Sequence, residues 1–366
     1  MKLGEACFLK SGKNITAKEI YVSPKDNLYP CYGGNGLRGD VDKYNYEGDY
    51  NLIGRQGALC GNINRVNGKF YATEHAVVVT PLISLDIDWL YFALVGMDLN
   101  QYHTGAAQPG LNIDILNNLE IDVPIIGEQI AQATVLNKIN GMIRNRKREL
   151  EKLDDLIKAR FVEMFGDPVN NPKGWQKKQL QELVTDDCTI SYGIVQTGDD
   201  QEEGVPVFRP VDIVNHIPTR SELKRTTEEI SNKYKRTILK GRELLITVRA
   251  NIADTYIVGE DFSGCNVGRG IVPIRTNEDV ITLEFLKHQI ESKHLNDNIK
   301  ALAKGITLIQ LNMEDLRELC LIVPPLSEQQ SFVRFAKQVD KSKAQVQKAL
   351  NETQLLFDSL MQKYFG

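Results

Sequence analysis

The sequence lacks the features of a membrane-bound or secreted protein. It has no run of about eighteen apolar residues, and its first stretch, MKLGEACFLKSGKN, has no apolar signal-peptide core. Its six cysteines form no C-x-x-C pair, and its five histidines have no metal-ligand spacing. We therefore expect a cytoplasmic protein with reduced thiols and no metal site.

Catalytic motifs are missing as well. There is no N-P-P-Y-like methyltransferase loop, and SGKN at residues 11–14 lacks the leading glycine and the Ser/Thr of a Walker A loop. We find no convincing Asp…Glu-x-Lys nuclease cluster. The sequence therefore predicts no catalytic residue and no cofactor bound by this chain.

A basic excess is absent too. The 366 residues include 44 Lys and Arg against 48 Asp and Glu, which gives a net charge of −4. Bulk charge thus offers no reason to expect nucleic-acid binding, and such a function must be argued from other features. The length itself indicates two or three domains.

One short motif, YGGNGLRG at residues 32–39, has the G-x-G-x-x-G spacing of a dinucleotide-binding loop. Such a loop must follow a buried strand and open a helix. The preceding residues contain Pro24 and Pro30, and the following stretch DVDKYNYEGDYN has no helical apolar stripe. The sequence favours a glycine-rich turn between short strands over a nucleotide site.

The most informative feature is an internal repeat. Residues 111–129, LNIDILNNLEIDVPIIGEQ, match residues 311–329, LNMEDLRELCLIVPPLSEQ, without a gap. The same offset of 200, from 111 to 311, relates the Phe-Gly pairs at 165–166 and 365–366. A register kept over about sixty residues indicates duplication.

Each copy continues into a proline-free segment that predicts a long helix, at residues 128–164 in the first copy. Apolar residues recur alternately every four and three positions, which is typical of a seam that pairs with another helix. Polar seam residues (Arg146, Lys343 and Thr353) match apolar residues in the other copy, so we expect the two helices to pair with each other, antiparallel. The alternative is that the two helices do not pair and that each lies on the surface of a separate hydrophobic core. The apolar seam residues are Leu136, Ile139, Ile143, Leu150, Leu153, Ile157, Val339, Val346, Leu350, Phe357 and Leu360.

The segments before the helices are weaker copies of one another. NLIGRQGALCGNI, from residue 51, resembles LLITVRANIADTYI, from residue 244, and this resemblance is expected to bring Arg55 beside Arg249. Short β-branched runs and glycine-rich turns predict α+β domains. The expected fold class is α+β, with two pseudo-symmetric domains separated by a pair of long antiparallel coiled-coil helices.

Several motifs follow one another in a distinctive order. YGGNGLRG precedes IGRQGALCGNI, VPIIGEQ and VPPLSEQQ each open a long helix, and MFGDPVNNPKGW joins the halves. In this order the chain resembles the specificity subunits of type I restriction–modification systems. The resemblance implies target-recognition domains at 1–110 and 171–310, each reading half of a split DNA sequence. It also implies conserved helical regions at 111–170 and 311–366, which set the spacer.

The resemblance further implies what the chain does and what it binds. It would be a non-catalytic subunit that recognises a bipartite site in double-stranded DNA and positions two modification (methyltransferase) subunits and the restriction (endonuclease/translocase) subunits. S-adenosylmethionine, ATP and Mg would belong to those partners only. An orphan scaffold that binds modification subunits through its coiled coil without reading sequence is the alternative, and an independent enzyme is disfavoured by the missing catalytic loop.

Base readout commonly uses arginine on guanine and glutamine on adenine. Arg38, Arg55 and Gln56 are expected at base edges, and Arg65 and Lys69 at phosphates. The glycines beside them would let the backbone approach DNA where a Cβ would collide. Because residues 1–110 hold ten basic and eleven acidic residues, we expect the isolated chain to bind DNA weakly. In the second domain the candidates are Arg209, Arg249, Asn251, Arg269, Lys304 and Gln310.

Overall fold

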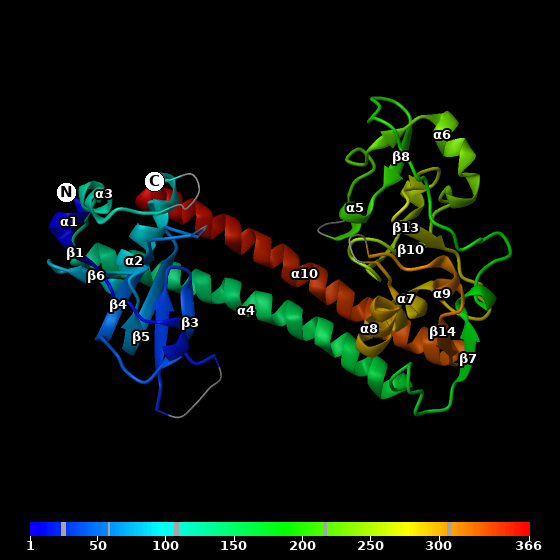
Figure 1. The fold of residues 1–366 in the computed structure, drawn as a ribbon, viewed down its shortest axis with the longest axis horizontal. Helices are drawn as coiled ribbons and strands as arrows, with labels where there is room; N and C mark the ends of the chain where they lie inside the picture. The colour runs from blue at the N-terminus through cyan, green and yellow to red at the C-terminus, as the bar shows by residue number, and fades with distance from the viewer. Residues whose placement is uncertain (23–26, 58, 106–109, 215–217, 306–308) are drawn as a thin grey trace. The chain divides into compact units, whose positions relative to one another are not determined.

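The computed structural model divides the chain into two compact units. One contains residues 1–149 and 346–366, and the other contains residues 150–345. Two 40-residue helices, α4 (Ile126–Phe165) and α10 (Leu326–Phe365), are each divided between the units, so that each unit includes about half of each helix (Figure 1). The structure describes residues 1–22, 27–57, 59–105, 110–214, 218–305 and 309–366. Among the helices in these ranges, none combines the length and apolar character that a membrane span requires.

The two long helices contact each other within both units. In the first unit the Arg146 guanidinium donates a 2.6 Å hydrogen bond to the carbonyl of Ala349. In the second unit the Lys343 ammonium pairs with the Asp154 carboxylate. From residue 146 to residue 154 of α4, the partner on α10 changes from residue 349 to residue 343, so the helices run antiparallel. The predicted pairing is confirmed, and the first helix begins at residue 126 rather than 128.

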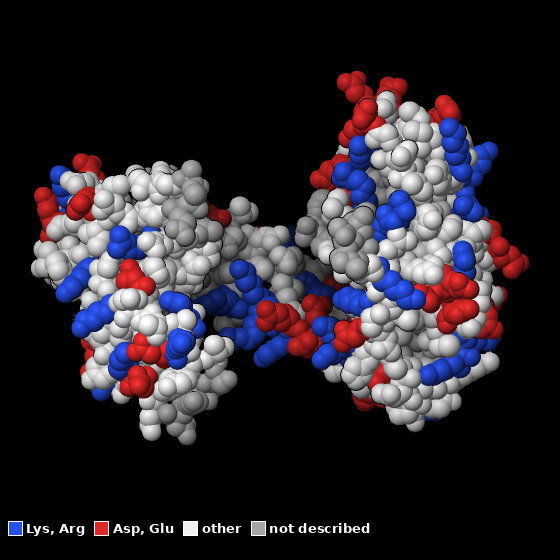
Figure 2. Space-filling view, viewed as in Figure 1, with Lys and Arg blue, Asp and Glu red and all other residues white. Residues whose placement is uncertain are grey.

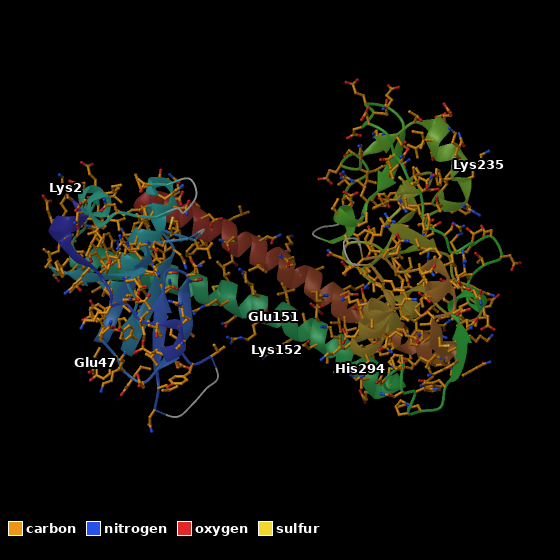
Figure 3. The ribbon with its side chains drawn as sticks, in the orientation of Figure 1. Lys2, Glu47, Glu151, Lys152, Lys235 and His294 are labelled. Carbon is orange, nitrogen blue, oxygen red and sulfur yellow. The ribbon has the colours of Figure 1, made fainter. Side chains whose placement is uncertain are left out.

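The predicted seam is the face that the helices bury. All eleven apolar seam residues are buried or half-buried, whereas Glu151 and Lys152, which lie between seam positions on α4, are exposed (Figure 3). The outer parts of the helices also enter the cores of the units, where Phe161 of α4 contacts Phe332 of α10. The boundaries at residues 110, 170 and 310 stay predictions.

The first unit is built on one six-stranded sheet with the order β1-β6-β4-β5-β2-β3. Neighbouring strands are antiparallel except for β2 and β5, which are parallel. Helix α2 packs on the sheet through the fully buried Trp89, whose ring lies 5.9 Å from that of Phe365 at the end of α10. The elements are α1 Leu3–Ala6, β1 Cys7–Ser11, β2 Tyr29–Gly33, β3 Gly36–Val41, β4 Tyr46–Gly54, β5 Ile63–Ala72, β6 Ala76–Pro81, α2 Ile87–Gly96 and α3 Ile113–Asn118.

The second unit has smaller sheets, with the orders β11-β10-β13, β12-β8-β9 and β14-β7. Its core centres on aromatic rings from Phe161 and Phe165 of α4, Phe285 of α7 and Phe332 of α10. The elements are β7 Gln176–Gln179, β8 Val205–Phe208, α5 Pro210–Val214, β9 Arg225–Thr226, α6 Glu228–Lys233, β10 Leu244–Thr247, β11 Thr255–Ile257, β12 Asn266–Val267, β13 Ile271–Ile274, α7 Leu283–Glu291, α8 Lys293–Leu302, α9 Met313–Arg317 and β14 Cys320–Val323.

The doubled Val-Pro-x-x-x-Glu-Gln motif has a structural explanation in its glutamine. Gln129 and Gln329 are both buried, and each Oε1 accepts a 2.9 Å hydrogen bond from the backbone N–H of a helix N-cap residue. That residue is Asp86 before α2 in the first unit and Thr282 before α7 in the second. Each glutamine Nε2 donates at 2.8 Å to the carbonyl of its own motif proline. The motif therefore fastens the start of a long helix to a short helix of the same unit.

A buried histidine predicts how the stability of the second unit depends on pH. His288 of α7 packs edge-on against Phe332, and burial lowers its pKa to about 4. Because the unfolded histidine titrates near 6.5, the unfolded chain binds more protons between pH 6.5 and 4, so stability falls as the pH drops through this window. Phenylalanine does not titrate, so between pH 7 and pH 4.5 the free energy of unfolding of His288→Phe should fall by about 2–3 kcal/mol less than that of the unsubstituted chain. Urea unfolding at pH 7 and pH 4.5 measures it, and an equal pH dependence in both proteins would contradict the assignment.

Candidate nucleic-acid interface

The glycine-rich stretch at residues 32–39 is a turn between two strands, as predicted, because β2 ends at Gly33 and β3 begins at Gly36. The structure gives a reason for its glycines that does not involve DNA. A Cβ on Gly34 would lie 2.9 Å from the Gln56 carbonyl oxygen, and one on Gly54 would lie 1.9 Å from that of Gly34. Close contact between two loops of the same unit therefore requires these glycines, and the expectation that they also allow close approach to DNA stays a prediction.

A hollow of about 400 Å³ opens where these loops meet. The exposed side chains of Arg38 and Gln56 lie along it, so the structure brings together two of the predicted base-reading residues. His75 and Asn35 line the same hollow and were missed by the sequence reasoning. Asn35 lies inside the glycine-rich turn at residues 32–39. Its position in that turn is the sequence signal that could have identified it.

Arg55 is adjacent to Gln56 in sequence but is held differently. Its Nη1 donates a 3.0 Å hydrogen bond to the Ser11 hydroxyl, and the side chain is half-buried. The side chain of Arg55 therefore interacts within the first unit, while that of Gln56 is exposed.

The two predicted phosphate ligands of the first domain also have partners within their unit. Arg65 of β5 pairs with Asp88 of α2. The Lys69 ammonium lies 4.8 Å from the centre of the Tyr44 ring and 3.9 Å from a carboxylate oxygen of Glu47. Neither side chain lines the hollow beside Arg38 and Gln56.

The place where Gln56 meets Gly110 is the loop junction of the first unit. Backbone pairing shows which residues of the second unit are equivalent to these two. Gln56 forms a β-bridge with Gly110 in the first unit, and Arg249 forms one with Gln310 in the second. Gly110 and Gln310 are repeat partners at the offset of 200. Arg249 is therefore equivalent to Gln56 and not to Arg55, so the predicted match of the two arginines was wrong by one residue.

The second unit places four predicted residues at its loop junction. The Arg249 Nε donates a 2.7 Å hydrogen bond to the Gln310 Oε1, and Arg249 Nη2 donates to the same oxygen. Burial and the positive charge of Arg269 lower the pKa of the Arg249 guanidinium. Lys304 exchanges two 3.0 Å backbone hydrogen bonds with Gln310. Arg269 and Lys304 are exposed, so the junction contains two exposed cationic residues as well as the held arginine.

The family model described as "Type I restriction modification DNA specificity domain" matches residues 1–154 and 172–353. The chain belongs to this family.

Known specificity subunits resemble this chain in sequence, and a solved structure resembles it in fold. The EcoprrI specificity subunit of Escherichia coli is 47% identical over 141 residues, which cover 38% of this chain and 35% of that one. The EcoBI specificity subunit of the same species is 24% identical over 335 residues, covering 82% and 70%. The S subunit of a type I system from M. genitalium aligns over 100% of this chain and 95% of that chain, with a TM-score of 0.64 and 16% identity.

The remaining predicted residues of this specificity subunit are Arg209 and Asn251, both in the second unit. Arg209 forks onto Asp212 with hydrogen bonds of 3.1 and 2.8 Å, and this bonding raises the pKa of Arg209. Asn251 is exposed and lines a separate hollow of about 490 Å³ with Asp254 and Lys300. Arg209 is thus held by Asp212, whereas Asn251 is exposed at this hollow.

The surface charge of the specificity subunit is mixed. Figure 2 shows Lys and Arg side chains interspersed with Asp and Glu on the visible face of each unit. Within the described residues, no group of three or more His, Cys, Asp or Glu side chains is placed to hold a metal ion.

Proposed function

We propose that the chain reads a bipartite sequence in double-stranded DNA, with one recognition domain for each half-site. The observation that carries this proposal is that both units have the same loop junction but present different side chains at it. The first unit presents Gln56 and Arg38, and the second presents Arg249 beside Arg269. Glutamine and arginine are suited to different base edges, so the two units are built to read different half-sites.

The same proposal assigns the chemistry to other subunits. The chain positions two modification (methyltransferase) subunits and the restriction subunits, which bind S-adenosylmethionine, ATP and Mg. A solved structure with a TM-score of 0.57 and 17% identity to this chain describes complex assembly and conformational transition of the type I R-M system, which supports the assignment of partners. The partner subunits would attract the DNA phosphates and so compensate for the weak attraction expected from the mixed charge of this chain.

The test is base-resolution methylation mapping in a host that expresses the chain with its modification subunits. We expect a bipartite methylated motif that disappears when the gene for this chain is deleted. Exchanging residues 1–110 for the corresponding domain of another family member should change one half of the motif and leave the other half intact.

Two results would contradict this proposal. If the exchange leaves both halves of the motif unchanged, the chain is a scaffold without its own sequence readout. If the purified chain alone methylates DNA with S-adenosylmethionine, its non-catalytic role is wrong.

A further inference from the structure

At the loop junction of the second unit, the Arg249 guanidinium is bonded along one edge and keeps another edge free to donate hydrogen bonds. Gln310 Oε1 accepts hydrogen bonds from both Nε and Nη2 of Arg249, which lie on the same side of the guanidinium. The remaining donors are the two hydrogens of Nη1 and the outer hydrogen of Nη2. Within the described residues, no other hydrogen-bond partner of this guanidinium is found.

The free edge has the geometry for one particular base. A guanidinium donates two parallel hydrogen bonds to N7 and O6 of guanine in the major groove. An unrestrained arginine loses rotamer entropy when it binds, and an acceptor already bonded to its adjacent Nε–Nη2 edge reduces that loss. Gln310 thus orients Arg249 before any ligand arrives.

The first unit lacks this arrangement at the equivalent place. Gln56 occupies the position of Arg249, and its bridge partner Gly110 has no side chain to hold it. Gln56 is exposed, whereas Arg249 is half-buried.

We propose that Gln310 is a positioning residue that holds Arg249 for a bidentate contact with a guanine in the second half-site. This inference rests on the proposed function, because it requires that the loop junction faces DNA. The first half-site is then read without a braced arginine at the equivalent position.

The backbone of Gln310 is fixed independently of its side chain. Besides the two backbone hydrogen bonds with Lys304, the following residue, Leu311, donates a 3.0 Å bond to the Val248 carbonyl. Substitutions of the Gln310 side chain are therefore expected to leave the fold intact. Equal thermal unfolding of Gln310→Ala and the unsubstituted chain checks this point.

The experiment uses the full chain in complex with its modification subunits and maps methylation at base resolution. In Gln310→Ala we expect the motif to persist, while one G·C pair of the second half loses its discrimination by about tenfold. Gln310→Glu should retain the specificity, because a carboxylate oxygen accepts the same two N–H groups. Arg249→Ala should relax the same base pair further, and no other.

A transfer of the pair to the first unit provides an independent test. Among the described residues, the nearest neighbour of a Cβ on Gly110 would be the Arg55 carbonyl oxygen, at an ordinary 3.5 Å, so a Cβ is accommodated there. We expect Gln56→Arg combined with Gly110→Gln to introduce a preference for guanine at one position of the first half-site. The second half-site should be unchanged.

The outcomes separate this inference from the proposed function. If the unsubstituted chain gives a bipartite motif but Gln310→Ala leaves every base pair of the second half unchanged, the inference is wrong and the proposed function stands. Relaxation at a base pair other than G·C, or uniform loss across the half-site with lowered thermal stability, would also overturn it. Absence of any bipartite motif would overturn both.

Discussion

Replacing Gln329 by leucine is expected to lower the free energy of unfolding of the second unit by about 3–5 kcal/mol. Leucine has a similar size but cannot hydrogen-bond. Its presence leaves the Thr282 N–H and the carbonyls of Val280 and Pro324 without the partner that Gln329 supplies. Each buried polar group left unsatisfied costs about 1–3 kcal/mol.

The neighbouring residue provides a matched control, because Gln330 is exposed on the same helix. Gln330→Leu should change the free energy of unfolding by less than about 0.5 kcal/mol. Urea unfolding measures both variants, and hydrogen exchange should show faster exchange of the Thr282 amide in Gln329→Leu alone. Equal stability of the two variants would mean that the buried glutamine does not fasten the helix.

Replacing Phe165 by alanine is expected to destabilise the second unit by about 3–5 kcal/mol. The ring is fully buried and lies 4.8 Å from that of Phe285, 5.2 Å from Phe161 and 5.7 Å from Phe332. Rings from α4, α7 and α10 meet around it, so its removal leaves a cavity that their backbones cannot readily fill.

The repeat partner Phe365 gives the matched comparison. Its ring is half-buried and contacts Trp89 of α2 at 5.9 Å. Phe365→Ala should therefore cost about half as much or less, since the cost of truncation grows with the burial of the removed atoms. Denaturant unfolding monitored by circular dichroism distinguishes the two. A larger loss in Phe365→Ala would show that the ring cluster does not dominate the second unit.

The long-range organisation of this protein was determined by its sequence alone. The repeat at 111–129 and 311–329 and the alternating four- and three-residue spacing specified two helices that pair through a seam. Such patterns are predictable because helical periodicity acts locally and because duplication copies a whole structural element. The sequence also located Gln129 and Gln329, although their role depends on contacts with distant residues.

The tertiary structure alone decided which candidate side chains are available to bind DNA. Arg55 and Arg65 look like Arg38 in the sequence, yet their guanidinium groups bond to Ser11 and Asp88. Those partners lie on other elements of the unit, and no local pattern in the sequence encodes the contact.

The equivalence of Arg249 with Gln56 was also decided by the tertiary structure. Residue type favoured a match between two arginines, but backbone hydrogen bonds across each unit fix the register of these loops. Helix periodicity is written in neighbouring residues, whereas the register of short strands and loops is set by partners far away in the chain. For this reason the scaffold was predictable and the arrangement of the candidate side chains was not.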